Sequence, residues 1–328
     1  MKIDRRKALQ GIGAGLLATA AFGAGNAGAQ TGYPDRAVRI VVPYPAGGSL
    51  DLVARTIAEQ LGRHWPRPIV VENRPGASGM IGADAVAKAP PDGYTLLLTV
   101  SSVIQTPYMY AKPLFDPMRD LVPVTDICTT NMVLTAGATG PRTLADVVRI
   151  AKQAPGKLAY ATYGLGSGSH LYMEVFGSAA GISLIHAPYK GEAPIVNDLL
   201  GGQIALGTLS PMVVRQHLRG GKLTPLAVSG DARAPMLPDV PTFEELGYRG
   251  LSGPSWFGLF TTRGTPQPVV EKVAADVAAV LAAPDVRQRL ADLGLNVKTS
   301  TPAAFAKLAK TDQAYWSEVI HKHNIRLD

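Results

Sequence analysis

Residues 41–55 read VVPYPAGGSLDLVAR, and the rest of the chain is organised around them. Residues 38–42 predict a buried strand, and the apolar spacing from Leu52 to Leu61 predicts a helix that opens near Ser49, a good N-cap. Adjacent glycines let a ligand approach the backbone, and the first helical turn offers unpaired N–H groups with partial positive charge. The stretch favours a site for a small anion, most simply a carboxylate; a turn without a ligand is the alternative.

This turn is not a familiar nucleotide site. Gly47-Gly48-Ser49 lacks the Gly-Lys-Ser/Thr ending of a P-loop and the third glycine of a dinucleotide fingerprint. Asp51 complements the helix dipole but would repel a highly charged phosphate. A small carboxylate held by neutral donors fits better.

The first 29 residues predict an export signal. Four basic residues precede an apolar run from Ala8 to Phe22, and Ala27-Gly28-Ala29 gives a cleavage pattern, so the exported chain should begin at Gln30. The run is short and glycine-rich for a membrane anchor, which is the alternative. The pair Arg5-Arg6 leaves the twin-arginine and the general routes both open. Either route predicts a periplasmic protein.

The composition is that of an ordinary globular protein and disfavours nucleic acid as a partner. The chain is 46% hydrophobic and 17% charged, with 26 prolines and 35 glycines. Its formal charge of +7 includes +3 from the export signal, and the remaining basic residues form no stripe with aromatics. The single cysteine, Cys128, cannot form an internal disulfide and is expected to be a buried thiol.

Strands alternate with helices from Val38 to about Val124, which predicts a parallel sheet with right-handed crossovers. A buried strand over residues 94–100 ends at Ser101-Ser102. Ligands of such sheets lie at the carboxyl ends of the strands, so we expect both serines near residues 44–49. A helix cap or a solvated turn is the alternative for the serines.

A second strand, glycine turn and helix follows at residues 157–176. The strand runs into Tyr163-Gly164-Leu165-Gly166-Ser167-Gly168-Ser169-His170. This turn has the same features as the first one: a strand, then glycines and a serine, then a helix start with unpaired N–H groups. Two such sites facing each other across a cleft would hold a ligand from both sides. The repetition favours a binding function.

His170 has no sequence neighbours at metal-ligand spacing, and the chain contains no Gly-x-Ser-x-Gly elbow. We therefore expect no metal and no cofactor, and a polar or helix-start contact for this histidine. A hydrolase using Ser167 or Ser169 with His170 is the rival class, but neighbours at one helix start point in different directions.

The chain should leave the first lobe along residues 122–135 and return along residues 226–228. This predicts lobe 1 over residues 30–124 and 229–328, and lobe 2 over residues 125–228. In lobe 2, Tyr189-Lys190-Gly191 follows another strand, and Lys190 is either a partner for an anion or an exposed turn lysine.

Five phrases carry a resemblance to a known family: PYPAGGSLD at 43–51, ENRPGA at 72–77, PYKG at 188–191, DLLGGQ at 198–203 and LPDVPT at 237–242. They resemble the Bug-type periplasmic receptors of tripartite tricarboxylate transporters, and they span the exported chain in the expected order. The resemblance implies an α/β fold of two lobes, the type II periplasmic-binding (Venus flytrap) fold, with two crossover strands. It also implies capture of a small organic acid for delivery to membrane subunits, without enzymatic activity; a ligand sensor for a signalling receptor is the alternative.

Matching the family position by position gives the expected ligand-binding residues, in a protein expected to be a monomer: Tyr44, Ala46, Gly47, Gly48, Ser49, Asp51, Ser101, Ser102, Tyr163, Gly166, Ser167, Ser169, His170, Tyr189, Lys190, Gly191 and Thr208. The chain departs from the family after Gln203, where an acidic, aromatic strand is usual and residues 204–210 read IALGTLS. The departure removes a partner for a ligand amine or hydroxyl, and predicts a less polar or amine-free acid.

Overall fold

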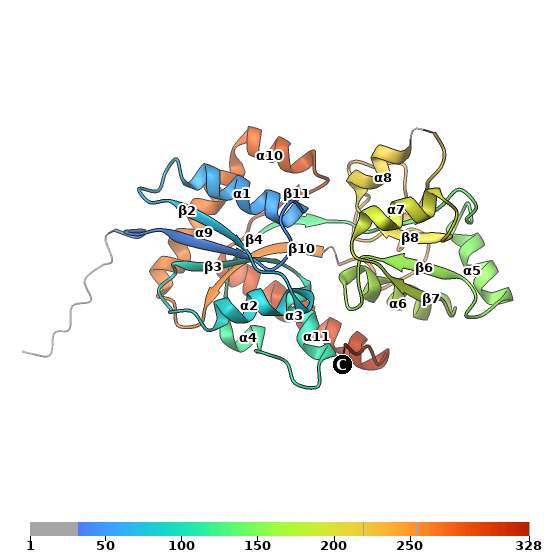
Figure 1. The fold of residues 1–328 in the computed structure, drawn as a ribbon, viewed down its shortest axis with the longest axis horizontal. Helices are drawn as coiled ribbons and strands as arrows, with labels where there is room; N and C mark the ends of the chain where they lie inside the picture. Colours follow the sequence, from blue (N-terminus) through green and yellow to red (C-terminus); the bar gives the residue numbers. More distant parts are fainter. Residues whose placement is uncertain (1–31, 219, 254, 328) are drawn as a thin grey trace, which may run out of the picture.

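The computed structural model describes residues 32–218, 220–253 and 255–327, and the predicted export signal lies outside them. They form two lobes side by side, each a mixed β-sheet covered by helices (Figure 1). None of the described helices has the length and apolar character needed to cross a membrane. The two-lobed α/β fold predicted from the sequence is confirmed.

The first lobe contains a six-stranded sheet in the order β11-β4-β10-β3-β1-β2. Its strands are β1 (Val38–Val42), β2 (Ile69–Asn73), β3 (Thr95–Val100), β4 (Leu121–Thr130), β10 (Ser255–Thr262) and β11 (Asn296–Val297). Its helices are α1 (Ser49–Leu61), η1 (Ala77–Gly79), α2 (Met80–Ala87), α3 (Ser102–Gln105), η2 (Thr106–Met109), α4 (Pro117–Asp120), α9 (Gln267–Ala282), α10 (Pro284–Ala291) and α11 (Pro302–Lys322).

The second lobe contains a five-stranded sheet in the order β7-β6-β8-β5-β9. Its strands are β5 (Val133–Ala136), β6 (Ala159–Thr162), β7 (Ile185–Pro188), β8 (Leu206–Leu209) and β9 (Thr224–Val228). Its helices are α5 (Leu144–Gln153), α6 (Gly168–Ala180), α7 (Glu192–Leu200) and α8 (Pro211–Leu218).

Apolar patterning explains the central unit β1–α1. The strand reads VRIVV and is buried along nearly its whole length, as expected for a central parallel strand covered on both faces. The helix buries Leu50, Val53, Ile57 and Leu61, which recur three or four positions apart and form one face against the sheet. The packing of this face fixes where the helix begins, and hence where the preceding loop lies.

The carboxyl ends of the parallel strands in the two sheets face each other. In the first sheet β1, β2 and β3 are parallel, and β4 runs in their direction because both β3 and β4 are antiparallel to β10. The chain leaves the carboxyl end of β4 and enters β5 after only Asn131 and Met132. Because β5 is antiparallel to β8, its first residue, Val133, lies opposite Leu209 at the carboxyl end of β8. The edge that carries the β–α loops of each sheet is therefore turned toward the other lobe.

The return crossing differs from the sequence prediction. Residues 226–228 do not lead back to the first lobe, because β9 pairs with β5 in the second sheet. The segment after β9 also packs there, with Leu237 and Val240 in one apolar cluster of the second lobe and Phe243 in another. We therefore propose that the second lobe spans residues 131–253, so that the chain returns immediately before β10.

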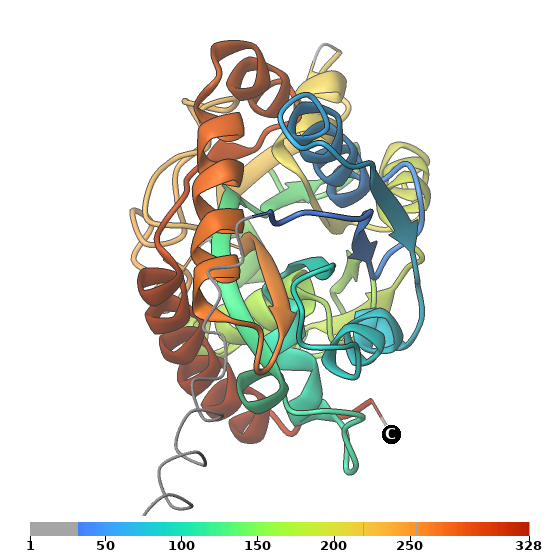
Figure 2. The same ribbon diagram turned by 90° about the vertical axis from the view of Figure 1, so that its left-hand side faces the viewer.

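Helix α11 joins the lobes at a third place. Its first half places Phe305 in the core of the first lobe, beside Trp256 and Phe260. Its second half places Trp316 and Ile320 in the core of the second lobe. Figures 1 and 2 show this helix, in dark red, running along one side of the molecule from the first lobe to the second. The helix therefore contributes apolar side chains to the cores of both lobes.

Candidate functional site

The first ligand loop, residues 44–49, joins β1 to α1 at the edge that faces the second lobe. Helix α1 begins at Ser49, and its N-cap is Gly48, with no side chain capping the helix. Ser49 is thus the first helical residue and not the N-cap that the sequence suggested. The N–H groups of Ser49, Leu50 and Asp51 bond to no group in the described part of the chain, and residues 45–49 are exposed. This leaves donors at a helix start available to an anion.

Asp51 holds the first ligand loop in place. Its Oδ2 accepts hydrogen bonds from the Gly47 N–H and from Arg55 Nε, each at 2.9 Å, and its side chain is almost completely buried. Burial alone would raise the pKa of this carboxyl, but the hydrogen bonds from Arg55 and Gly47 outweigh burial and lower the pKa. Asp51, predicted to contact the ligand, therefore supports the loop, and Arg55 offsets its charge.

Tyr44 and the two predicted serines form one wall beside this loop. The Tyr44 hydroxyl lies 2.9 Å from Ser102 Oγ. Ser101 Oγ lies 3.1 Å from Ser255 Oγ, which belongs to the strand that enters from the other lobe. Both serines are buried at the carboxyl end of β3, where they were expected.

The second ligand loop, residues 163–170, joins β6 to α6. Ser167 is the N-cap of α6: its Oγ accepts the His170 N–H at 3.4 Å and donates to the Gly164 carbonyl at 2.7 Å. Ser169 Oγ lies 3.0 Å from Ser167 Oγ. The N–H groups of Gly168 and Ser169 bond to no group in the described residues, so this helix start also offers free donors.

A stacked pair of histidines supports the second ligand loop from behind. His170 Nδ1 accepts the Gly166 N–H at 3.3 Å, and the His170 ring stacks on His186 with centroids 3.9 Å apart. His186 Nε2 lies 2.7 Å from Thr162 Oγ1 at the end of β6. Burial, and then the charge of His186, lowers the pKa of His170 to about 3, and burial lowers the pKa of His186 to about 4. Both rings are therefore neutral at physiological pH and act as structural supports.

The rival hydrolase arrangement gains no support from this geometry. The acceptor nitrogen of His170 is engaged by a backbone N–H, and no hydrogen bond joins its ring to Ser167 or Ser169 in the described structure. A nucleophile–base pair requires such a contact.

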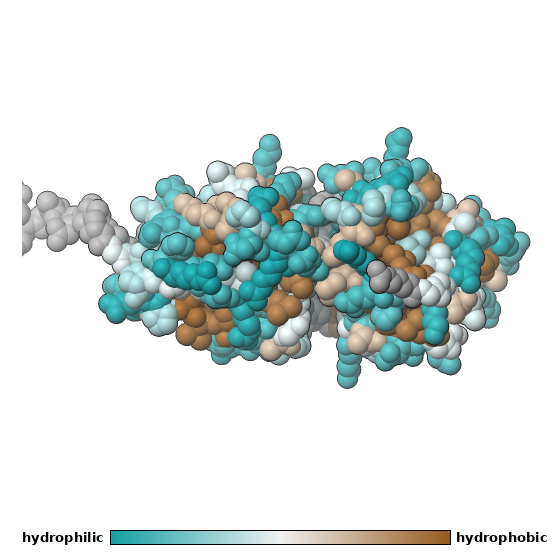
Figure 3. All heavy atoms as spheres, turned by 90° about the horizontal axis from the view of Figure 1, so that it is seen from above, coloured by the Kyte–Doolittle hydropathy of each residue, from teal (hydrophilic) through white to brown (hydrophobic). Residues whose placement is uncertain are grey.

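Tyr163 is the first residue of the second ligand loop. It directly follows Thr162, the last residue of β6, which is parallel to β7 and β8, so it lies at the edge of the second sheet that is turned toward the first lobe. Burial raises the pKa of its hydroxyl, and the charge of Glu192 adds to the rise. Figure 3 shows the lobes as two masses with a groove between them. The two ligand loops therefore border one shared interlobe space.

Three predicted residues have other roles or positions. Tyr189 donates to Asp198 Oδ2 at 2.6 Å, near the far end of α7, and this hydrogen bond raises the pKa of Tyr189 to about 12. Thr208 is fully buried and donates to the Ala161 carbonyl of the adjacent strand. Lys190 is exposed on the turn before Gly191, which is the N-cap of α7 with φ of 101°. Tyr189 and Thr208 therefore serve the packing of the second lobe.

Sequence reasoning missed Glu192, the first residue of α7. Its carboxylate accepts hydrogen bonds from the Ser210 N–H and from Ser210 Oγ, the latter at 3.0 Å. Burial raises its pKa, although the hydrogen bonds from Ser210 oppose the rise. The sequence feature that could have indicated Glu192 is its position directly after a strand and a glycine turn, at the sheet edge where the ligand loops lie.

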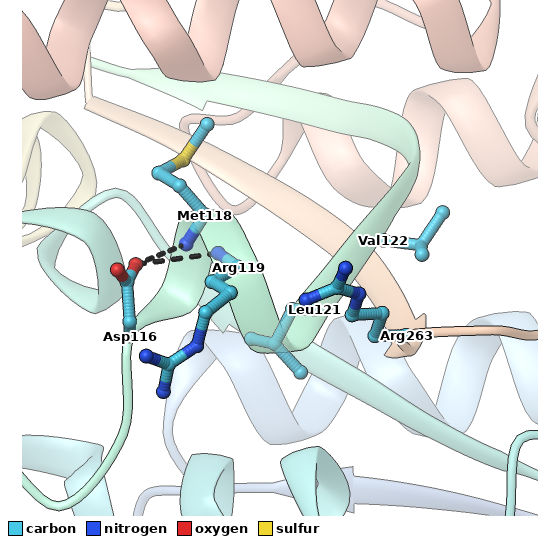
Figure 4. A pocket seen from close by; sticks show the side chains of 6 residues that line it. All are labelled: Asp116, Met118, Arg119, Leu121, Val122 and Arg263. Atoms are coloured by element: carbon cyan, nitrogen blue, oxygen red, sulfur yellow. Dashed lines mark hydrogen bonds between the residues drawn. The ribbon is translucent and has the colours of Figure 1, made fainter.

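Two hollows lie away from the ligand loops. One, of about 510 Å³, is lined by Asp116, Met118, Arg119, Leu121, Val122 and Arg263 (Figure 4). Arg119 is already paired with Asp120 there, at 2.8 Å. The other lies between α6 and α11. No predicted site residue lines either hollow.

The described residues show no acidic, histidine or cysteine cluster suited to a metal ion. Cys128 is buried, and burial, followed by the charge of Asp126, raises the pKa of its thiol. The thiol therefore has the inert character expected of a core cysteine.

Comparison with known proteins places the chain in a family. Residues 53–325 match the model of the tripartite tricarboxylate transporter family receptor. Protein BugT of Bordetella pertussis is 34% identical over the full length of both chains. A UPF0065 protein from the tcbD-tcbE intergenic region of Pseudomonas sp. is 34% identical over 98% of this chain and 96% of its own length.

Solved structures agree with this assignment. The periplasmic binding protein BugD is 35% identical, with a TM-score of 0.78 over 90% of this chain and 99% of its own. Rpa4515 of R. palustris, solved with adipate, is 33% identical, with a TM-score of 0.80 over 90% of this chain and 99% of its own. MatC of Rhodopseudomonas palustris, solved with bound malate, is 31% identical, with a TM-score of 0.77 over 88% of this chain and 100% of its own. The chain therefore belongs to the tripartite tricarboxylate transporter receptor family of periplasmic solute-binding proteins.

Proposed function

We propose that this protein is a periplasmic receptor that captures a small organic acid between its lobes and delivers it to the membrane subunits of a tripartite tricarboxylate-type transporter. The observation that carries the proposal is the placement of two glycine-lined helix starts, Gly48–Ser49 and Gly166–Ser167, on the facing edges of the two sheets. Each offers N–H groups without protein partners to a carboxylate. The family relatives solved with adipate and with malate support an acid as the ligand.

Capture follows from the hinge geometry. The lobes turn about the short crossing at residues 131–132 and the return crossing before β10, and a ligand that contacts both loops favours the closed arrangement. Each charge-assisted hydrogen bond contributes about 1.5–3 kcal/mol, so a few of them reach the roughly 8 kcal/mol of micromolar binding after ordering costs. No chemistry on the ligand is required, and we propose that the protein acts as a monomer without catalysing a reaction.

Isothermal titration calorimetry with monocarboxylic and dicarboxylic acids of two to eight carbons tests the proposal. We expect at least one acid to bind with a one-to-one ratio and to remain chemically unchanged after hours with the protein. Absence of binding by every acid, or conversion of the bound acid, would count against an acid receptor.

A further inference from the structure

The segment 102–109 reaches from the first lobe into the second. It begins at Ser102, whose Oγ lies 2.9 Å from the hydroxyl of Tyr44 in the first ligand loop, and it runs through α3 and η2. Ile104 is fully buried in an apolar cluster of the first lobe, whereas Met109 is fully buried in an apolar cluster of the second lobe. One short, buried segment therefore connects the wall beside the first ligand loop to the core of the other lobe.

The tail segment, residues 323–327 after α11, fastens the far end of this connection. Ile325 is buried in the same apolar cluster as Met109, and its N–H donates to the Ile320 carbonyl at 3.1 Å. The Leu327 N–H donates to the Met109 carbonyl at 2.9 Å, and the Leu327 side chain packs against the same cluster. These two main-chain hydrogen bonds hold the tail segment to α11 at one point and to η2 at the other.

Met109 and Leu327 meet the second ligand loop at Gly166. A Cβ added at Gly166 would lie 2.8 Å from Met109 Sδ, too close unless Met109 moved, and 3.1 Å from each terminal carbon of Leu327. Gly166 has a φ of 71°, and its N–H donates to His170 Nδ1 at 3.3 Å. The loop therefore has one support from its own lobe, the histidine pair, and a second support from Met109 and Leu327.

This second support acts close to the donors at the start of α6. Gly166 is buried, whereas Tyr163 and Leu165 of the same loop are exposed. The free N–H groups of Gly168 and Ser169 come directly after this buried position, and their direction depends on the conformation of the loop. Exposed loops with few buried contacts open easily, so the contact at Gly166 has a large influence on the order of this loop.

We propose that Met109 and Leu327 are positioning residues of the second ligand loop. Packed on Gly166, they hold the N–H groups of Gly168 and Ser169 in the direction that a carboxylate requires, without touching the ligand themselves. The effect on acid binding rests on the proposed function, whereas the support of the loop does not and is measurable without a ligand.

Hydrogen–deuterium exchange of the ligand-free protein tests the support directly. Leu327→Ala removes the side chain from Gly166 but keeps the main-chain hydrogen bond to Met109. We expect the Gly166 and His170 amides, which are hydrogen-bonded within the loop, to exchange at least about tenfold faster. Leu327→Met, which keeps an apolar side chain of similar volume, should exchange like the unchanged protein. Leu114→Ala, at an exposed leucine between η2 and α4, is the matched control.

A second set of variants tests the same contact from the side of the loop. Gly166→Ala places a Cβ against Met109, so it should speed the same exchange and lower the melting temperature more than Gly156→Ala. Gly156 is the matched control because its φ is 66° and an added Cβ would meet only Ser183 Oγ, at 3.9 Å. Met109→Ala gives room to the new Cβ, so the double variant Gly166→Ala/Met109→Ala should be less perturbed than the sum of the two single variants.

Calorimetry with the acids of two to eight carbons connects the support to binding. Leu327→Ala should bind each acid that the unchanged protein binds at least about tenfold more weakly, because only a fraction of its molecules then present both N–H groups in the binding direction. Leu327→Met should retain the affinity. Thermal melts show that every variant is folded at the temperature of the titration.

The outcomes separate this inference from the proposed function. Unchanged exchange at residues 163–170 in Leu327→Ala, or strictly additive effects in the double variant, would overturn the inference. Faster exchange with full acid affinity would also overturn it, because the order of the loop would then not control binding. If no acid binds to the unchanged protein, the proposed function fails, and the exchange data still decide whether Met109 and Leu327 hold the loop.

Discussion

The carboxylate of Asp51 accepts the Gly47 N–H at 2.9 Å, so a residue of the helix fixes the loop that precedes it. The same oxygen accepts Arg55 Nε, which compensates the charge of a buried aspartate at the place where an anion is expected to bind. The loop can thus be rigid and nearly neutral at once. The free N–H groups at the start of α1 then remain the positive feature that a carboxylate meets.

Replacing Gly48 with valine should abolish ligand binding without unfolding the protein. Gly48 has an ordinary extended conformation, and an added Cβ would meet only the Pro45 carbonyl, at 3.8 Å. The new side chain would therefore occupy space meant for the ligand. We expect a loss of at least about a hundredfold in affinity by calorimetry, with a melting temperature close to that of the unchanged protein. Gly32→Val, at another open position, is the control, and full affinity in Gly48→Val would contradict the site.

Replacing Asp51 with alanine should destabilise the protein more than replacing Arg55 with alanine. The aspartate is buried, and its loss removes the charge-assisted hydrogen bond from the Gly47 N–H, which contributes about 1.5–3 kcal/mol. Arg55 is half-exposed, and removing such a partner costs about 1 kcal/mol or less. Urea unfolding measures both values. Equal losses in the free energy of unfolding would show that Asp51 stabilises the protein through its ion pair with Arg55 and not through its hydrogen bond to the loop.

The stacked histidines should make the protein lose stability in mild acid. The pKa of His170 is lowered to about 3 in the folded state, so the unfolded chain binds more protons and stability falls as the pH drops below 6.5. For His170 alone the loss between pH 8 and pH 5 is about 2 kcal/mol. Glu174 and Tyr160 also contact this pair: Glu174 lies 3.7 Å from His170 Nε2, and the Tyr160 ring stacks on His186, while His323 lies 3.8 Å from Glu174 on the other side.

Urea unfolding at pH 8 and pH 5 checks this expectation. The variant His170→Asn should be less stable at pH 8 because the Gly166 N–H loses its acceptor, but it should lose less stability on acidification. The same replacement at exposed His64 is the control. Identical acid sensitivity in His170→Asn and in the unchanged protein would refute the role given to the pair.

Replacing Asp126 with asparagine should stabilise the protein at neutral pH by about 1 kcal/mol. Asp126 lies in β4, is 2% exposed, and its Oδ1 has no hydrogen-bond partner in the described residues. Burial raises its pKa, so its contribution to stability is present at low pH and is lost as the pH rises through the folded-state value. The advantage of Asp126→Asn should therefore vanish below pH 4 in urea unfolding. An advantage that is independent of pH would point to packing instead.

Local sequence patterns predicted the ligand loops well. The strand before Pro43, the helix after Gly48 and the second helix start at Ser167 all depend on apolar periodicity and on glycine next to serine, which act over a few residues. The alignment of the two helix starts across the lobes followed from the rule that ligands lie at the carboxyl ends of parallel strands.

Long-range pairing explains most of what the sequence did not reveal. Residues 226–228 read as a strand, but only the pairing of β9 with β5 places them in the second sheet. Helix α11 has an apolar face along its length, and nothing local shows that this face is shared between two cores. The Glu192 carboxylate is held by a hydrogen bond from Ser210, which lies 18 residues further along the chain and cannot be identified as its partner from local sequence.

The most direct test of the account is the electron density of the protein crystallised with an acid that calorimetry shows to bind. The account predicts that the acid lies between the lobes, with its carboxylate in hydrogen-bond distance of the N–H groups at Ser49 and Leu50 or at Gly168 and Ser169. Density for the acid elsewhere, for example beside Arg119 and Arg263 with the interlobe space unoccupied, would contradict it.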